Sequence, residues 1–171
     1  MTVEELLIGL VLGYQFAELK REQDRNVLLL QHSLKIAHSD ALTGLANCYA
    51  LYIALAELLQ NGTLTFIDID NLKLYNDYFG HRKGDELLQT FGNALLSELH
   101  GVGVLHRIGG DEFAIKSHHF AANKVVEYIE NAVEILRQKD FVSAGASYGM
   151  VISGDAETID ELKEIADTCI Y

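Results

Sequence analysis

The sequence predicts a mixed α/β domain preceded by a helix. Apolar residues recur at three- and four-residue steps from about Thr2 to Ser39. Beyond this segment, helical stripes alternate with short apolar runs of strand character, and a Gly-Gly pair joins two of these runs. With 171 residues, 49% of them hydrophobic, the chain is long enough for one compact domain plus an appendage. We therefore expect an N-terminal helical segment over residues 1–39 and one mixed domain over residues 40–171.

The N-terminal segment is expected to form one helix or two. A heptad that places Leu12 and Leu19 in a helix–helix core places Asn26 and Ser33 at the next two core positions. Such polar core positions can set the register of a coiled coil, but they weaken it. Two alternatives stay open: the helix pairs with a second copy to give a homodimer, or it folds back on its own domain.

Neither a membrane span nor a nucleic-acid surface is expected. The uncharged run Leu6–Ala17 is about half of the ~20 residues that a span needs, and the basic start of a signal peptide is missing. Cys48 and Cys169 are too few for a disulfide framework and lack metal-ligand spacing. The net charge of −12 disfavours binding to a polyanion. We expect a cytoplasmic protein in which metal ions would compensate the charge of any bound nucleotide.

After Asp40 the sequence predicts alternating helices and strands. Apolar stripes predict helices over Tyr52–Leu59, Leu88–Leu99, Val126–Leu136 and Ile159–Cys169. Apolar runs predict strands over Leu64–Ile69, Val104–Ile108, Phe113–Lys116 and Phe141–Ile152. Gly109-Gly110 lies between the second and third of these strands and suits a hairpin, because glycine tolerates positive φ. The expected fold is a mixed sheet that contains an antiparallel hairpin.

Two carboxylates mark the end of the first predicted strand. Because side chains alternate along a strand, Asp68 and Asp70 project on the same side. Their repulsion favours a cation nearby, and Mg²⁺ is held in this way by one or two carboxylates plus substrate phosphates. The alternative is that these residues cap a helix that begins near Asn71.

A second acidic pair follows the predicted hairpin tip. Asp111 and Glu112 can point in different directions, one towards a metal and the other towards a reacting hydroxyl. Gly109 and Gly110 would let a nucleotide approach the backbone closely. A surface hairpin with solvated charges is the alternative.

These residues resemble those of a known family. Gly109-Gly110-Asp111-Glu112-Phe113 is the signature that names the GGDEF family of diguanylate cyclases. The segments Asp40–Leu45, Asp68–Asp77 and Gly80–Asp85 resemble other motifs of the family, in the same order. The resemblance implies a palm-like mixed sheet flanked by helices, and it implies a homodimer that condenses two GTP into cyclic di-GMP and two pyrophosphates. A GTP-binding or dimerisation module without catalysis is the alternative.

The resemblance also implies roles for single residues. The metal ligands fall on Asp68, Asp111 and the backbone carbonyl of Ile69, which would hold two Mg²⁺ ions, or Mn²⁺ in their place. Glu112 falls on a proton acceptor or metal-side stabiliser, and Arg107 on a residue that stabilises charge at the reacting phosphate. Substrate phosphates would be met by the backbone amides of Asn71 and Leu72 and, at the terminal phosphates, by Lys73. The guanine edge would be read by Asn76 and Asp85, and Leu88 would lie beside the base. Gly109 and Gly110 would also contact the substrate.

Two departures from the family pattern concern the end of the chain and regulation. The closing motif is present only as Ala166–Tyr171, and the Lys and Arg expected after it are missing, so either the C-terminal end is truncated or the activity is reduced. The Arg-x-x-Asp motif that binds product in many members would occupy His100 and Gly103, and both of its functional groups are absent. We therefore expect no product inhibition through this route.

Overall fold

The structure is a computed structural model, and it describes residues 2–58, 62–117 and 122–152. The chain divides into two compact units, Met1–Ala37 and His38–Tyr171. Over the described ranges, none of the helices combines the length and the apolar character needed to cross a bilayer.

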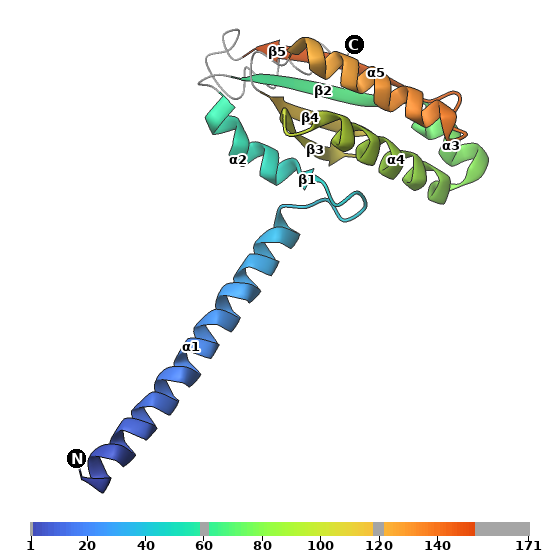
Figure 1. Ribbon diagram of the computed structural model, residues 1–171. Coiled ribbons are helices and arrows are strands. Elements are labelled where there is room, and N and C mark those ends of the chain that lie inside the picture. Colours follow the sequence, from blue (N-terminus) through green and yellow to red (C-terminus); the bar gives the residue numbers. More distant parts are fainter. Residues whose placement is uncertain (1, 59–61, 118–121, 153–171) are drawn as a thin grey trace. The chain divides into compact units, whose positions relative to one another are not determined.

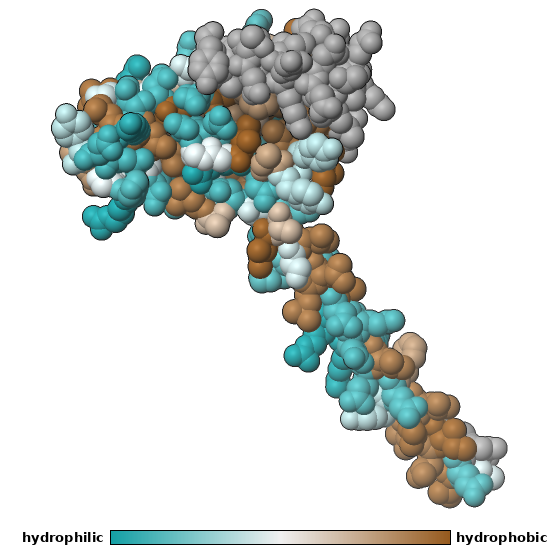
Figure 2. All heavy atoms as spheres, turned by 180° about the vertical axis from the view of Figure 1, so that it is seen from behind, coloured by the Kyte–Doolittle hydropathy of each residue, from teal (hydrophilic) through white to brown (hydrophobic). Residues whose placement is uncertain are grey.

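The first unit is one continuous helix, α1 (Val3–Ala37). Fifteen large apolar side chains between Val3 and Ile36 are exposed on it. A run of seven polar residues, Lys20–Asn26, interrupts them, and Figure 2 shows this run as a hydrophilic band between two hydrophobic stretches. Because seven residues fill every position of a heptad, no single apolar seam passes through this band.

The second unit is built on one five-stranded sheet (Figure 1). Its elements in chain order are β1 (Ala46–Asn47), α2 (Cys48–Leu58), β2 (Thr63–Asp70), α3 (Leu72–Phe79), α4 (His81–Leu99), β3 (Gly103–Gly109), β4 (Glu112–Ser117), α5 (Ala122–Gln138) and β5 (Gly145–Ile152). The strand order is β1-β3-β4-β2-β5. The β1–β3 pair is parallel and the other pairs are antiparallel, so the predicted mixed sheet with an internal hairpin is confirmed.

The core lies between this sheet and the two longest helices of the unit, α4 and α5 (Figure 1). Ile67 and Ile69 alternate along β2 and are fully or almost fully buried, as the period of two requires for one covered face. Phe91 of α4 meets Phe113 of β4 edge to face, with ring centroids 5.2 Å apart. These contacts fix α4 over the strands that carry the acidic residues.

Several boundaries differ from those that the sequence predicts. The strand predicted from Phe141 begins only at Gly145, because the preceding residues form a turn in which the Phe141 amide donates to Leu136 O at the end of α5. Helix α4 begins at His81, ahead of its apolar stripe. Strand β1 has two residues and was not predicted. The closing helix predicted over Ile159–Cys169 lies outside the described residues.

Candidate functional site

The two acidic segments meet where β2 and the β3–β4 hairpin lie side by side. In the antiparallel ladder Asp68 pairs with Glu112, and the Ile69 amide donates to the backbone oxygen of Asp111 over 3.1 Å. Neighbouring antiparallel strands place paired residues about 5 Å apart. The fold therefore brings Asp68, Ile69, Asp111 and Glu112 to one end of adjacent strands, although more than forty residues of chain separate the two segments.

Asp68 lies in an electrostatically unfavourable place. Burial raises the pKa of this carboxyl above its usual range, and the nearby charges of Asp111 and Asp70 raise it further. Asp70 has a neutral partner, because Ser147 Oγ donates to its Oδ1 over 2.9 Å. A cation next to Asp68 and Asp111 would relieve their mutual repulsion.

The donor set fits a hard ion such as Mg²⁺ only in part. Among the described residues no three His, Cys, Asp or Glu side chains gather in a metal-binding group. Mg²⁺ commonly takes one or two carboxylates and completes its octahedron with water and substrate phosphates. Asp68, Asp111 and the Ile69 carbonyl fit such an incomplete set, which a triphosphate would have to complete.

The hairpin tip is shaped by its glycines. Gly110 has a φ of 49°, in the left-handed region, where a residue with a Cβ is strained. The register shifts between Arg107 and Gly109, so Ile108 is an extra residue on the β3 side. Such a bulge redirects the strand at its end, here immediately before Asp111.

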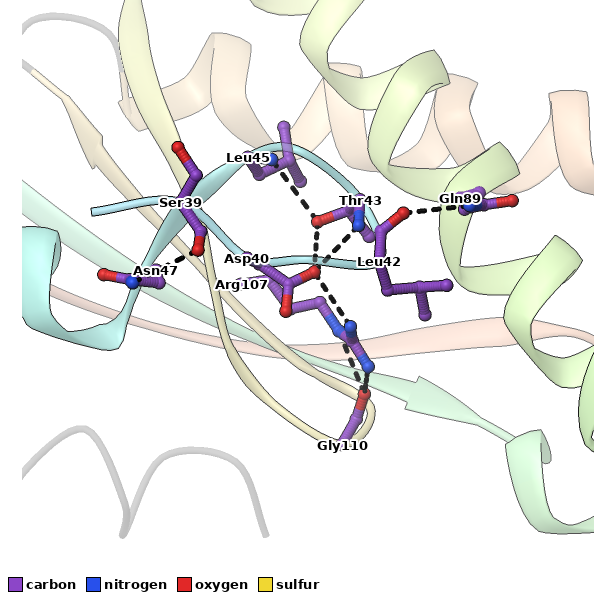
Figure 3. A network of polar contacts seen from close by, with 9 residues as sticks. All are labelled: Ser39, Asp40, Leu42, Thr43, Leu45, Asn47, Gln89, Arg107 and Gly110. Carbon is purple, nitrogen blue, oxygen red and sulfur yellow. Dashed lines mark hydrogen bonds and ion pairs between the residues drawn. The ribbon is translucent and has the colours of Figure 1, made fainter. Parts of the chain in front are cut away.

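A network of polar contacts joins this tip to the turn that follows α1 (Figure 3). Asp40 Oδ1 accepts hydrogen bonds from the Thr43 amide at 2.9 Å, from Thr43 Oγ1 at 2.6 Å and from Arg107 Nη1 at 2.9 Å. Arg107 also donates through Nε and Nη2 to the carbonyl oxygen of Gly110, at 3.2 and 2.7 Å. Burial alone would raise the pKa of Asp40, but the hydrogen bonds from Thr43 and Arg107 hold that pKa below its usual range.

The segment after β2 presents backbone amides at the start of α3. Asn71 precedes the helix in the left-handed conformation, with φ 66°, and its Nδ2 donates to Ser143 O over 2.7 Å. Leu72 is buried beneath the first turn, whereas Lys73 is exposed. A helix N-terminus favours anions because its first N–H groups lack partners within the helix. This arrangement is compatible with the predicted phosphate contacts.

The two residues expected to read the base come from α3 and from the first turn of α4. Asn76 is partly buried, and a Cβ built on Gly84 would overlap its side-chain amide. Gly84 thus allows the two helices to approach, and Asp85 follows it on an exposed position. Leu88 is only 3% exposed and belongs to the core, so it offers little surface to a ligand.

Sequence reasoning missed the role of Asp40 and the partners of Arg107. The segment Asp40–Leu45 carries a family motif, but no local pattern shows that its carboxylate meets a side chain 67 residues later. One local pattern does indicate part of this arrangement: an Asp followed three residues later by a Thr, as in Asp40 and Thr43, is typical of a turn in which the Asp side chain accepts hydrogen bonds from the Thr.

Comparisons with known proteins agree with this geometry. The family described as "Diguanylate cyclase, GGDEF domain" matches residues 37–171. The chain is 31% identical over 185 residues to diguanylate cyclase DgcP of Escherichia coli, covering 99% of this chain and 53% of that protein. It is 30% identical over 155 residues to diguanylate cyclase DgcS of Shewanella oneidensis, covering 85% of this chain and 52% of that protein. The chain thus spans about half the length of these relatives.

A solved structure has the same fold over nearly the whole chain. The coiled coil and GGDEF domain of DgcB from Caulobacter crescentus, solved in complex with c-di-GMP, superposes with a TM-score of 0.81 at 24% identity, covering 94% of this chain and 92% of that one. The family match over residues 37–171 and the 31% identity to DgcP over 99% of the chain show that the chain belongs to the family of GGDEF-domain diguanylate cyclases.

Proposed function

We propose that this protein is a diguanylate cyclase that condenses two GTP into cyclic di-GMP and two pyrophosphates. The observation that carries the proposal is the β2–β4 register, which puts Asp68 beside Asp111 and Glu112. Membership of the family and the activities named for DgcP and DgcS support it. The reaction forms two bonds, each from a ribose 3′ oxygen to the α-phosphorus of the other GTP, and each phosphorus releases pyrophosphate.

The proposed site residues have different roles in binding metal, binding phosphate and transferring the proton. Asp68, Asp111 and the Ile69 carbonyl would hold two Mg²⁺ ions, the ion that the family generally uses, and bound Mg²⁺ would neutralise charge on the triphosphate. The amides of Asn71 and Leu72 would meet phosphate oxygens, and the exposed ammonium of Lys73 would reach the terminal phosphates. Glu112 is proposed either to accept the 3′-hydroxyl proton or to stabilise the metal side.

Guanine is proposed to be selected between α3 and α4. A carboxylate at Asp85 can accept from the N1–H and N2–H₂ groups of guanine, and an amide at Asn76 can both donate and accept. Adenine lacks that pair of donors. Leu88 contributes at most a small apolar patch, because it is almost fully buried, and Gly109 and Gly110 leave the backbone open to the nucleotide.

A homodimer is proposed because one site holds only half of the product. The exposed apolar residues of α1 are suited to pairing with a second copy (Figure 2). Burying a Leu, Ile or Phe side chain contributes ~1.5–3 kcal/mol. The polar run Lys20–Asn26 lies between the two apolar stretches and would limit how tightly they pair.

The experiment is incubation of the protein with GTP and Mg²⁺ and detection of cyclic di-GMP. Asp68→Ala and Asp111→Ala should abolish product formation while the protein stays folded. Turnover within about tenfold of wild type, against the ~10²-fold or greater loss expected for removal of transition-state electrostatics, would contradict the site assignment. GTP binding without turnover in the wild type would favour the alternative, a GTP-binding module that does not catalyse.

Feedback by product is proposed to be absent at the family's usual surface motif. Gly103 pairs with Ser117, and a Cβ added there would lie 2.7 Å from the Lys116 backbone oxygen. The strand therefore has no room for the aspartate of that motif, and His100, at φ 42°, takes the position of its arginine. Inhibition by cyclic di-GMP should be purely competitive with GTP. A non-competitive component at micromolar product would contradict this prediction.

A further inference from the structure

Arg107 is occupied at each of its nitrogens by groups of the protein itself. Nη1 donates to Asp40, and both Nε and Nη2 donate to Gly110 O. The side chain is only 11% exposed. A guanidinium recognises phosphate through its planar fork of donors, and here the fork is directed at a backbone carbonyl. The Nε–Nη2 edge of Arg107 is thus taken up by the hairpin backbone.

The carbonyl that Arg107 binds belongs to the peptide preceding Asp111. A planar peptide group moves as one body, so holding Gly110 O also sets the orientation of the Asp111 amide. On the other side of the residue, the Asp111 carbonyl accepts from the Ile69 amide at 3.1 Å. Asp111 is therefore held at both of its peptides, once from β3 and once from β2.

Asp40 anchors Arg107 in a closed turn. The Asp40 amide donates to Leu45 O at 2.8 Å, and the Asp40 carbonyl accepts from the Gly44 amide at 2.9 Å. The turn is also tied to α4, because Gln89 Nε2 donates to Leu42 O over 2.9 Å (Figure 3). Thus the turn is held by hydrogen bonds within itself and to α4, and it begins three residues after the end of α1 in the chain.

We infer that Asp40 and Arg107 are positioning residues, which hold the Gly109-Gly110 tip so that Asp111 faces Asp68. Arg107 acts from behind the hairpin through Gly110 O and makes no contact with phosphate. This inference rests on the proposed function. It replaces the role at the reacting phosphate that the family resemblance implies for Arg107.

The test compares substitutions at both ends of the contact. Asp40→Asn and Arg107→Lys should each lower kcat about 10- to 100-fold, because small displacements of reacting groups have effects of this size. Both should raise the Mg²⁺ concentration at half-maximal rate and leave the KM for GTP at saturating metal nearly unchanged. The double variant should lower kcat no further than the single variant with the larger loss, as expected for two residues that act as one unit.

Thr43→Val provides a variant that keeps both charges. It removes the 2.6 Å hydrogen bond to Asp40 and should give a smaller loss of the same kind. Glu134→Gln is the matched control, since it breaks an exposed carboxylate–arginine pair on α5 with 3.7 Å between Arg137 Nη1 and Glu134 Oε2. It should leave kcat unchanged. Wild-type kcat in Asp40→Asn and Thr43→Val, together with a loss in Arg107→Lys, would overturn the inference, as would additive losses in the double variant.

Amide hydrogen exchange separates this inference from the proposed function. The Ile69 amide should exchange faster in Asp40→Asn and Arg107→Lys, because its acceptor on Asp111 is no longer held, whereas the amides of α5 should be unaffected. This measurement requires no turnover. If the wild type made no cyclic di-GMP but the exchange changed as expected, the proposed function would fail and the positioning role would stand. Unchanged Ile69 exchange in both variants would overturn the positioning role.

Discussion

Asp68, a proposed metal ligand, lies where its charge is unfavourable for the fold. The residue is partly buried and close to the charges of Asp70 and Asp111. Asp70 gains a hydrogen bond from Ser147 on the neighbouring strand β5. The repulsion that remains is useful to a protein that binds a cation there, and unfavourable to the metal-free protein.

We therefore predict that Asp68→Asn abolishes activity and raises the melting temperature of the metal-free protein by a few degrees. The substitution keeps the shape and removes one of the repelling charges. Thermal unfolding in the presence of a chelator measures the effect. Asp140→Asn is the control, because Asp140 is an exposed carboxylate at φ 70°, a conformation that Asn tolerates. Equal melting temperatures for wild type and Asp68→Asn would argue against repulsion at this site.

Asp40 has the opposite effect on stability. Its pKa is lowered in the folded state, so its contribution is fully present above the unfolded value of about 4 and is lost as the pH falls through the lower folded value. Asp40→Asn should accordingly be less stable than wild type at pH 7, and the two should converge as the pH falls below about 4. Urea unfolding at a series of pH values checks this, and a difference that is independent of pH would contradict it.

The candidate residues could be predicted from the sequence, but their partners could not. Asp68, Asp111 and Glu112 stand out as carboxylates at a strand end and after a hairpin tip, but the pairing of β2 with β4 that joins them is a long-range contact that no local pattern shows. The contact between Asp40 and Arg107 depends on how two distant turns meet, and neither turn has a periodicity that shows it. No partner of Arg107 within the protein could therefore be predicted, whereas the structure places its guanidinium against Asp40 and Gly110 O.

At the scale of elements, the approach of α3 to α4 depends on one glycine. Gly84 lies in the first turn of α4, and the Asn76 side chain occupies the space that a Cβ would need. Glycine within a helix is usually unfavourable by roughly 1 kcal/mol relative to alanine. Here that penalty is compensated by room for a polar side chain next to Asp85.

Gly84→Ala should therefore weaken GTP binding while the protein stays folded. The gain in helix propensity offsets part of the clash, so the protein should stay folded, but displacement of Asn76 should raise the KM for GTP several-fold. Steady-state kinetics in two backgrounds give the decisive measurement. In an Asn76→Ala background the clash with the amide is gone and only Leu72 Cδ1, at 3.2 Å, remains close to the added Cβ, so Gly84→Ala should then have little further effect on KM. The same rise in both backgrounds would mean that the clash with Asn76 is not the cause.

Long amphipathic elements were predictable, whereas short ones were not. The stripes of α4 and α5 and the apolar run of β2 gave clear signals, because each buries one face or both faces against the core. Strand β1 consists of Ala46 and Asn47 and exists because it pairs with His106 and Arg107. No pattern within two residues could reveal it. The start of β5 was placed too early because Phe141 is apolar but belongs to the turn after α5.

At the scale of the whole molecule, α1 is the element through which we propose that two copies associate. Its exposed apolar residues form two stretches on either side of Lys20–Asn26. If they pair with a second copy, the local concentration of the partner site rises, and the reaction between two GTP-loaded subunits becomes independent of dilution.

Removal of residues 1–37 should lower the specific activity mainly at low protein concentration. The shortened protein should begin at His38, because His38 O and Ser39 O accept hydrogen bonds from Asn47. Specific activity across a dilution series, with and without α1, is the measurement, and sedimentation gives the matching oligomeric state. Equal activity of both proteins at every dilution would show that α1 is not what holds the dimer.

The pairing of β1 with β3 also bears on the order in which the protein folds. Ala46 lies beside His106 in a parallel ladder, so this pair can form only after the chain has been made sixty positions beyond Ala46. Closing so long a loop delays a contact relative to local ones. During synthesis α1 can form as soon as it leaves the ribosome, whereas the turn at Asp40 acquires its partner only once the β3–β4 hairpin has emerged. Nascent chains could therefore associate through α1 before either of them has an assembled reactive centre.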